Sequence, residues 1–172
     1  ALSGDLVLGD KEGDFTLPSA NTSLAYFQNT AIKSVTAKEN VRWIRAQMFN
    51  GCSQLESVTL EGNVTNIEAN AFAGCSALKL FSLGHRPETW PGYQGSAAYK
   101  CRFLVNATDP GWAAYMADSA KFTAWGSLDQ TTKGKYTAAF PGVKKPIGLS
   151  KTLPANQWLC NLKEPGMKLI FR

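Results

Sequence analysis

The chain has 172 residues, of which 44% are hydrophobic and 18% are charged, and its formal net charge is +5. This composition is too apolar for a disordered chain and is typical of one folded domain, or of one domain with a small appendage. No apolar run approaches the roughly 18 residues needed to cross a bilayer, so we expect no direct membrane insertion.

Residues 1–17 are predicted to be a lead-in to the fold. Its first part, from Ala1 to Asp14, is polar and shows no basic segment followed by an apolar stretch and a cleavage site. An export signal is therefore not present in this chain, although a removed signal would leave no trace in it.

An internal repeat of 23 residues dominates the next region. Residues 40–62 read NVRWIRAQMFNGCSQLESVTLEG, residues 63–85 read NVTNIEANAFAGCSALKLFSLGH, and the two align without a gap. A degenerate first copy precedes them, with Tyr26 aligned on Phe49 and without the Gly-Cys pair. We therefore predict about three repeats over residues 18–85.

The apolar positions of one unit predict its structure. In the spacing L-x-x-V-x-L of Leu55, Val58 and Leu60, apolar and polar residues alternate, which predicts a strand with one buried face. Residues 69–72 suit a single helical turn that delivers Phe72 to the core. Because one unit cannot bury these side chains alone, the copies must stack into a parallel sheet.

The pattern A-F-x-G-C-S-x-L followed by a V-T-L strand resembles the BspA-like leucine-rich repeats of bacterial surface proteins. The resemblance covers residues 18–85, and it implies a curved solenoid used for adhesion or ligand binding, with no catalytic residues to carry over. The sequence departs from the family at Glu61-Gly62 and Gly84-His85, where a proline commonly follows the strand.

The repeat stops after His85, and residues 86–128 are predicted to form a capping segment. Residues 101–105 can alternate as a strand, and Asp109-Pro110 offers an N-cap and a first-turn proline for a helix. Strand and helix together resemble the terminal cap that often follows such repeats.

Residues 129–172 are predicted to be a basic extension that ends in a β-hairpin. They hold eight basic and two acidic residues, whereas residues 1–128 hold ten basic and eleven acidic ones. A short helix is expected through Tyr136. The strand-like runs 158–162 and 167–171 flank a Pro-Gly turn, and residues 147–149 could add a third strand. The overall prediction is an α/β fold: a short solenoid, a strand-helix cap and a small hairpin tail.

The cysteines and the single histidine are not expected to carry chemistry. Cys52 and Cys75 occupy one repeat position and are predicted to be buried free thiols, whereas a disulfide between Cys101 and Cys160 is left open. His85 lies at a turn, and no catalytic, metal-binding or phosphate-binding motif accompanies it. We therefore predict no enzyme, no cofactor and no metal.

Two kinds of side chain are candidates for ligand binding. Small hydroxyls, including Ser57, Thr59 and Ser82, should face outward from the repeat strands. Trp43, Trp90 and Tyr93 could stack on sugar rings or be buried in the core. Trp43 occupies a variable repeat position, which favours exposure.

The function predicted from these features is a non-catalytic extracellular or cell-surface module of a bacterium. We expect a secreted or surface-bound monomer that binds a host or neighbouring extracellular protein in adhesion. Two alternatives remain: a glycan-binding module that uses the aromatics and the basic tail, and a purely structural part of a surface protein. No nucleic-acid signature accompanies the spread lysines, so nucleic acid is not expected as a partner.

Overall fold

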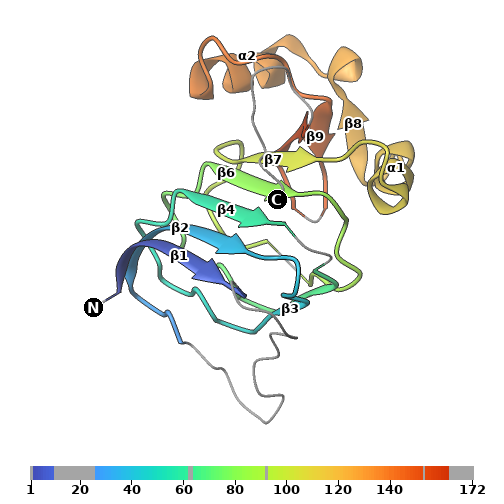
Figure 1. Cartoon of the computed structure of the whole chain (residues 1–172). Coiled ribbons are helices and arrows are strands. Elements are labelled where there is room, and N and C mark those ends of the chain that lie inside the picture. Colours follow the sequence, from blue (N-terminus) through green and yellow to red (C-terminus); the bar gives the residue numbers. More distant parts are fainter. Residues whose placement is uncertain (1, 10–25, 62–63, 92, 153, 163–172) are drawn as a thin grey trace.

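The computed structural model describes residues 2–9, 26–61, 64–91, 93–152 and 154–162. Its elements in chain order are β1 (Ser3–Leu8), β2 (Ala31–Ala37), β3 (Trp43–Ile44), β4 (Ser57–Leu60), β5 (Asn66–Ile67), β6 (Leu80–Leu83), β7 (Arg102–Val105), α1 (Pro110–Ala117), β8 (Phe122–Ala124), η1 (Trp125–Ser127), α2 (Gln130–Ala139), β9 (Gly148–Ser150) and β10 (Trp158–Asn161). The described residues thus have mixed content, mostly strands with two α-helices (Figure 1).

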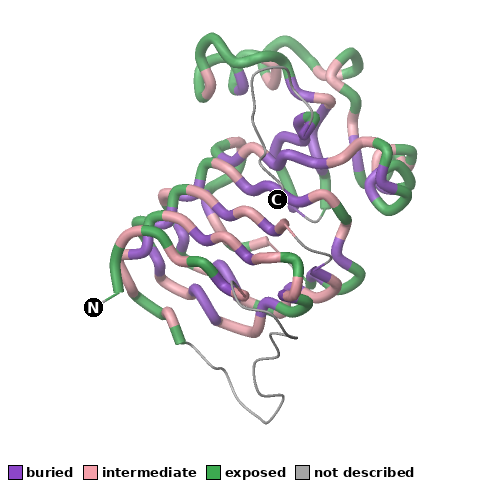
Figure 2. Tube along the Cα trace, viewed as in Figure 1, coloured by how far each residue is buried: buried purple, intermediate pink, exposed green. Residues whose placement is uncertain are grey.

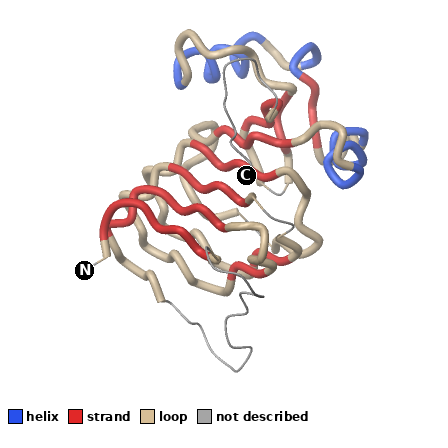
Figure 3. The backbone as a smooth tube through the Cα atoms, in the orientation of Figure 1, coloured by secondary structure: helices blue, strands red, loops and turns tan. Residues whose placement is uncertain are grey.

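Within the described residues one eight-stranded sheet runs through the molecule, in the order β1-β2-β4-β6-β7-β10-β9-β8. The strands from β1 to β7 pair in parallel, and β10 continues the parallel pairing beside β7. β9 is antiparallel to both β10 and β8. Figure 3 shows these strands stacked across the molecule, with the helices on the β7 side of the parallel strands.

The register of the sheet follows the sequence repeat. Val35 pairs with Val58, and Val58 pairs with Phe81, so equivalent positions in β2, β4 and β6 lie side by side. β3 and β5 form a second parallel pair, in which Trp43 lies beside Asn66. The predicted strands and the gapless alignment of residues 40–62 with 63–85 are confirmed.

The alignment of the first copy is correct in its strand, where residues 34–36 pair with residues 57–59, but it is wrong by one residue at the turn. Phe27, and not Tyr26, stacks on Phe49, with ring centroids 5.3 Å apart, and Phe49 stacks on Phe72 at 5.4 Å. Asn29 takes the left-handed conformation (φ 56°) that Gly51 and Gly74 take in the later copies. The first copy is therefore one residue shorter between this turn and its strand.

The predicted helical turn at residues 69–72 is a hydrogen-bonded turn with a left-handed residue. Asn70 has φ 60°, and the N–H of Ala73 donates to the carbonyl of Asn70 at 3.1 Å. Because an α-helix needs successive right-handed residues, Asn70 ends any helical run at once. Phe72 nevertheless reaches the core, as predicted.

The sheet extends beyond the predicted repeats on both sides. β1 lies in the segment predicted to be a lead-in, and it pairs in parallel with β2. At the other end β7 continues the register from β6, with Phe103 beside Phe81. The predicted three strands of residues 18–85 are therefore part of a longer parallel series.

Two hydrophobic cores lie on opposite faces of the sheet. The first packs behind β1 to β7 and contains the inward side chains of these strands, such as Val58 and Phe81. The second contains Leu104, Tyr136, Trp158 and Cys160. Because Leu104 alternates with the inward Phe103 and Val105, this second core covers the outer face of β7 and β10. Buried and half-buried positions alternate along β4, whereas three successive positions are buried in β7 (Figure 2).

Several predictions for the C-terminal segments are confirmed. Asp109 caps α1 by accepting the N–H of Trp112 at 3.1 Å, and α2 extends through Tyr136. β9 pairs with β10, so the third strand predicted near residues 147–149 exists. The second hairpin strand, residues 167–171, lies outside the described residues.

Candidate binding surface

The outer side of β2, β4 and β6 is built from side chains that alternate with the core positions. In register across the three strands, Ser34, Ser57 and Leu80 form one column, and Thr36, Thr59 and Ser82 form the next. We call these six side chains the outward face. Because neighbouring parallel strands lie about 4.8 Å apart, the hydroxyls of β2 and β4 form a compact polar surface on a rigid support.

The hydroxyls of the outward face are not equally accessible. Ser57 and Thr59 are half-buried, and Ser34 donates a hydrogen bond to the carboxylate of Asp5 on β1 at 2.6 Å. Ser82 is only 4% exposed, and it lies beside Leu104 of the second core. The sequence alone predicts that Ser57 and Ser82 both face outward. In the structure Ser82 is covered, so the accessible part of the outward face lies over β2 and β4.

Trp90 and Tyr93 lie against the main core. Trp90 is 4% exposed, and its ring centroid is 5.6 Å from that of Phe81 and 5.7 Å from that of Phe103. The Tyr93 ring lies 5.0 Å from that of Phe103, and its hydroxyl accepts the N–H of Ser96. Burial raises the pKa of Tyr93 well above its ordinary value. Of the two outcomes that the sequence left open, Trp90 is therefore buried, whereas Tyr93 is partly buried against the core.

Trp43 is exposed, as its variable repeat position predicts, but it is not part of the outward face. It lies on β3, which belongs to the separate two-stranded sheet, and 43% of its surface is accessible. The guanidinium of Arg45 lies 4.4 Å from the ring centroid. The six predicted site residues thus fall in three places: the outward face, the core and β3.

Ion pairs connect neighbouring repeat units at a spacing of 23 residues. Lys38 pairs with Glu61 at 3.0 Å, and Arg45 pairs with Glu68 at 3.0 Å. Glu68 also accepts the backbone N–H of Ala46 at 2.9 Å. Both pairs are partly buried, and pairs near the surface each contribute about 0.2–1 kcal/mol, so they fix the register of the units more than they stabilise the fold.

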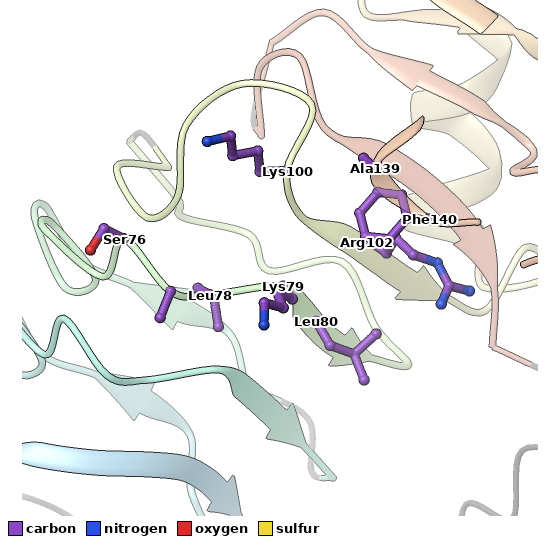
Figure 4. A pocket seen from close by; sticks show the side chains of 9 residues that line it. Ser76, Leu78, Lys79, Leu80, Lys100, Arg102, Ala139 and Phe140 are labelled. Atoms are coloured by element: carbon purple, nitrogen blue, oxygen red, sulfur yellow. The ribbon is translucent and has the colours of Figure 1, made fainter. Parts of the chain in front are cut away.

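A groove of about 650 Å³ opens where the outward face meets the C-terminal segment. Its described lining consists of residues 76–80, Lys100, Arg102, Ala139 and Phe140. Figure 4 shows the side chains of the β6 unit along one wall and those of Lys100, Arg102 and Phe140 along the other. We call this site the step groove. Sequence reasoning missed it because its walls come from segments far apart in the chain.

The buried thiols are poorly suited to catalysis, and the histidine contacts a helix cap. All four cysteines are buried thiols, so the disulfide left open between Cys101 and Cys160 is not formed. Burial raises the pKa of both Cys75 and Cys101 to about 12, which disfavours the reactive thiolate. His85 contacts the helix-capping carboxylate of Asp109 at 2.8 Å. In the described part of the chain, no group of three or more potential ligands could hold a metal ion.

None of the helices in the described ranges is long and apolar enough to cross a membrane. A family model described as a BspA type leucine rich repeat region matches residues 14–111 in six copies. Neither a curated protein nor a solved structure matches the chain. The family match covers more than half of the chain, and its six copies exceed the three predicted repeats.

Proposed function

Because the chain belongs to the BspA-type leucine-rich repeat family, we propose that it is a non-catalytic module that binds another protein. Proteins with such repeats are typically associated with bacterial surfaces, and the repeats generally serve protein interaction. The proposed setting is therefore a bacterial surface or its surroundings, with a host or neighbouring extracellular protein as the partner and adhesion as the role.

The proposed architecture is a short solenoid closed at one end. Residues 18–85 would form its repeats, residues 86–128 its cap and residues 129–172 a basic extension. Support comes from the parallel register of β2, β4 and β6, and from the second core that covers the outer face of β7 and β10. Such a solenoid presents its binding surface as a continuous strip of neighbouring strands.

The observation that carries the proposal is the open outward face over β2 and β4. Ser57 and Thr59 are half-buried and carry hydroxyls that can both donate and accept hydrogen bonds, while their strand is fixed by the core on its other face. A surface held rigid before binding loses little conformational entropy when a partner arrives. The outward face is therefore suited to recognition by a complementary protein surface.

A protein array tests this proposal. The intact chain is applied to host extracellular-matrix and bacterial surface proteins, next to the variant S57R/T59R and the control variant S53R/Q54R. Ser53 and Gln54 are exposed in a turn of the same repeat, so the control adds the same charge away from the outward face. We expect S57R/T59R to weaken binding by at least about tenfold and the control to leave it within twofold. Binding that both variants retain would refute the assignment to the outward face.

A glycan-binding module is the second candidate, and the exposed ring of Trp43 favours it. Aromatic rings of this kind can stack on sugars. Salt-sensitive binding to an acidic polysaccharide, lost in W43A, would favour this candidate. Silence on both protein and glycan arrays would favour a structural role in a larger surface assembly.

A further inference from the structure

The step groove differs from the outward face in both charge and polarity. Three cations line it, Lys79, Lys100 and Arg102, and none of the nine described lining residues is acidic. Lys79 and Lys100 are exposed, and Arg102 is half-buried beside Phe140, with its guanidinium 5.7 Å from the ring centroid. Glu56 precedes Lys79 by one repeat, but it lies outside the lining. The groove therefore concentrates positive charge at one end of the outward face.

Apolar side chains lie between these cations. Leu78 is buried, whereas Leu80 and Phe140 are half-buried and pack against the second core. A volume of about 650 Å³ lies within the range of sites that enclose a small ligand or a few side chains. An occupant that matches this site has an apolar group between negative charges.

We propose that the step groove binds an acidic peptide segment of a partner protein, with one apolar side chain held between flanking carboxylates. The apolar side chain packs against Leu80 and Phe140, and the carboxylates face Lys79 and Lys100. This proposal rests on the proposed function, because it names the chemistry of the partner that the outward face contacts. The groove continues the outward face, so one partner can occupy both.

The lining favours a peptide over an acidic glycan. An aromatic face on which a sugar ring could stack is offered only by Phe140 among the described lining residues. The Phe140 ring already contacts the guanidinium of Arg102, and its centroid lies 5.2 Å from that of Tyr136. An aliphatic or aromatic side chain of a peptide needs only the apolar surface that Leu80 and the accessible part of Phe140 provide.

Labelled peptides of nine residues test the proposal by fluorescence anisotropy with the full chain. The first peptide has one central phenylalanine flanked by aspartates; lysines replace the aspartates in the second, and serine replaces the phenylalanine in the third. We expect the first to bind at least about tenfold more tightly than the others, with an affinity that falls as salt rises. Equal affinity for all three peptides would overturn the proposal.

Charge reversal locates the binding. The variant K79E/K100E is compared with the control K33E/K145E, which changes the net charge equally. Lys33 occupies the repeat position of Lys79 two units earlier, and both control residues are exposed and outside the groove. We expect K79E/K100E to weaken binding at least about tenfold and the control to weaken it less than threefold. Equal losses would overturn the assignment to the groove, and circular dichroism verifies that both variants fold.

Three further results distinguish failure of the step-groove proposal from failure of the proposed function. An array partner that K79E/K100E retains and S57R/T59R loses would refute the groove while supporting the proposed function. An oligogalacturonate that displaces the acidic peptide at lower concentration, and depends on Lys79 and Lys100, would overturn the peptide assignment in favour of a glycan. A partner that both variants lose, and that contains an acidic segment with an apolar residue, would support both proposals.

Discussion

At the residue scale, the repeat depends on a column of left-handed turn positions. Gly51 and Gly74 have φ near +74°, and Asn29 takes the same conformation in the first copy. A Cβ atom on Gly51 would come too close to the side-chain oxygen of Asn29. The glycine of the Gly-Cys pair is therefore needed because neighbouring units are in tight contact at this turn.

Replacing Gly51 with alanine is expected to destabilise the fold by about 1–3 kcal/mol, because it adds both left-handed strain and a close contact. The matched control is G134A in α2, where an added Cβ meets nothing within 4 Å. Removing a glycine from a helix should stabilise the fold by about 0.5–1 kcal/mol. Urea denaturation measures both, and equal effects of the same sign would contradict this account of the turn.

The buried thiols carry a second prediction at this scale. The thiol of Cys75 donates to the carbonyl of Phe49 at 3.2 Å, and burial raises its pKa from 9.0 to about 12. In the unfolded chain the thiol ionises at lower pH, so its contribution to stability is complete below pH 9 and is lost as pH rises toward 12. We expect an apparent loss of about 1 kcal/mol per pH unit above pH 9 for this thiol.

Urea denaturation at a series of pH values, compared between the parent chain and C75A, checks this expectation. The variant should lose less stability than the parent as pH rises. At neutral pH, iodoacetamide should modify the cysteines of the native chain slowly and those of the urea-unfolded chain rapidly. Rapid native modification of Cys75 would show that its thiol is more accessible and more acidic than the structure indicates.

At the scale of elements, the repeat strands could be predicted and the packing of the C-terminal segment could not. Identical residues at a fixed spacing define β4 and β6 because each unit buries the same positions. β1 shows no such identity, because Gly4 and Asp5 interrupt its apolar positions. It is a strand because its backbone pairs with β2. Pairing with a neighbour is a tertiary effect that local composition does not encode.

The candidate site likewise has one part that the sequence predicts and another part that it does not. The outward direction of Ser57 and Thr59 follows from the alternation of the strand, so the sequence predicts it. The burial of Ser82 and the step groove depend on the second core, which joins β7 and β10 with α2. No spacing in the chain relates Lys79 to Phe140, because the contact arises when α2 packs on the sheet.

Helix α2 is held to the sheet mainly by Tyr136. Its ring centroid lies 5.1 Å from that of Trp158, and its hydroxyl donates to the carbonyl of Lys144 at 2.5 Å. We expect Y136F to cost about 1 kcal/mol, because only the hydrogen bond is lost. Y136A should cost about 3–5 kcal/mol, because a buried ring is also removed.

The control for this series is T131A, an exposed position on the same helix, which should change stability by less than about 0.5 kcal/mol. Urea denaturation followed by tryptophan fluorescence compares the variants. A cost of Y136A no larger than that of Y136F would mean that α2 does not depend on this ring, and that the second core does not close the end of the sheet.

At the scale of the whole molecule, the two ends of the parallel series differ. The outer face is covered at β7 and β10 and open at β2 and β4. A chain ended after Leu128 would uncover Leu104, so point variants test recognition better than truncation does. Under the proposed function, this asymmetry would direct a partner to one strip of the sheet, bounded by the step groove.

Hydrogen–deuterium exchange on the chain with a bound array partner tests recognition through the outward face. We expect slower exchange in the segments 31–37, 57–61 and 79–80, and unchanged exchange in the turn at residues 45–54. Both regions belong to the same repeats, so the turn is an internal control for overall stabilisation. Protection confined to the turn or to Trp43, with no change in β2 and β4, would contradict recognition through the outward face.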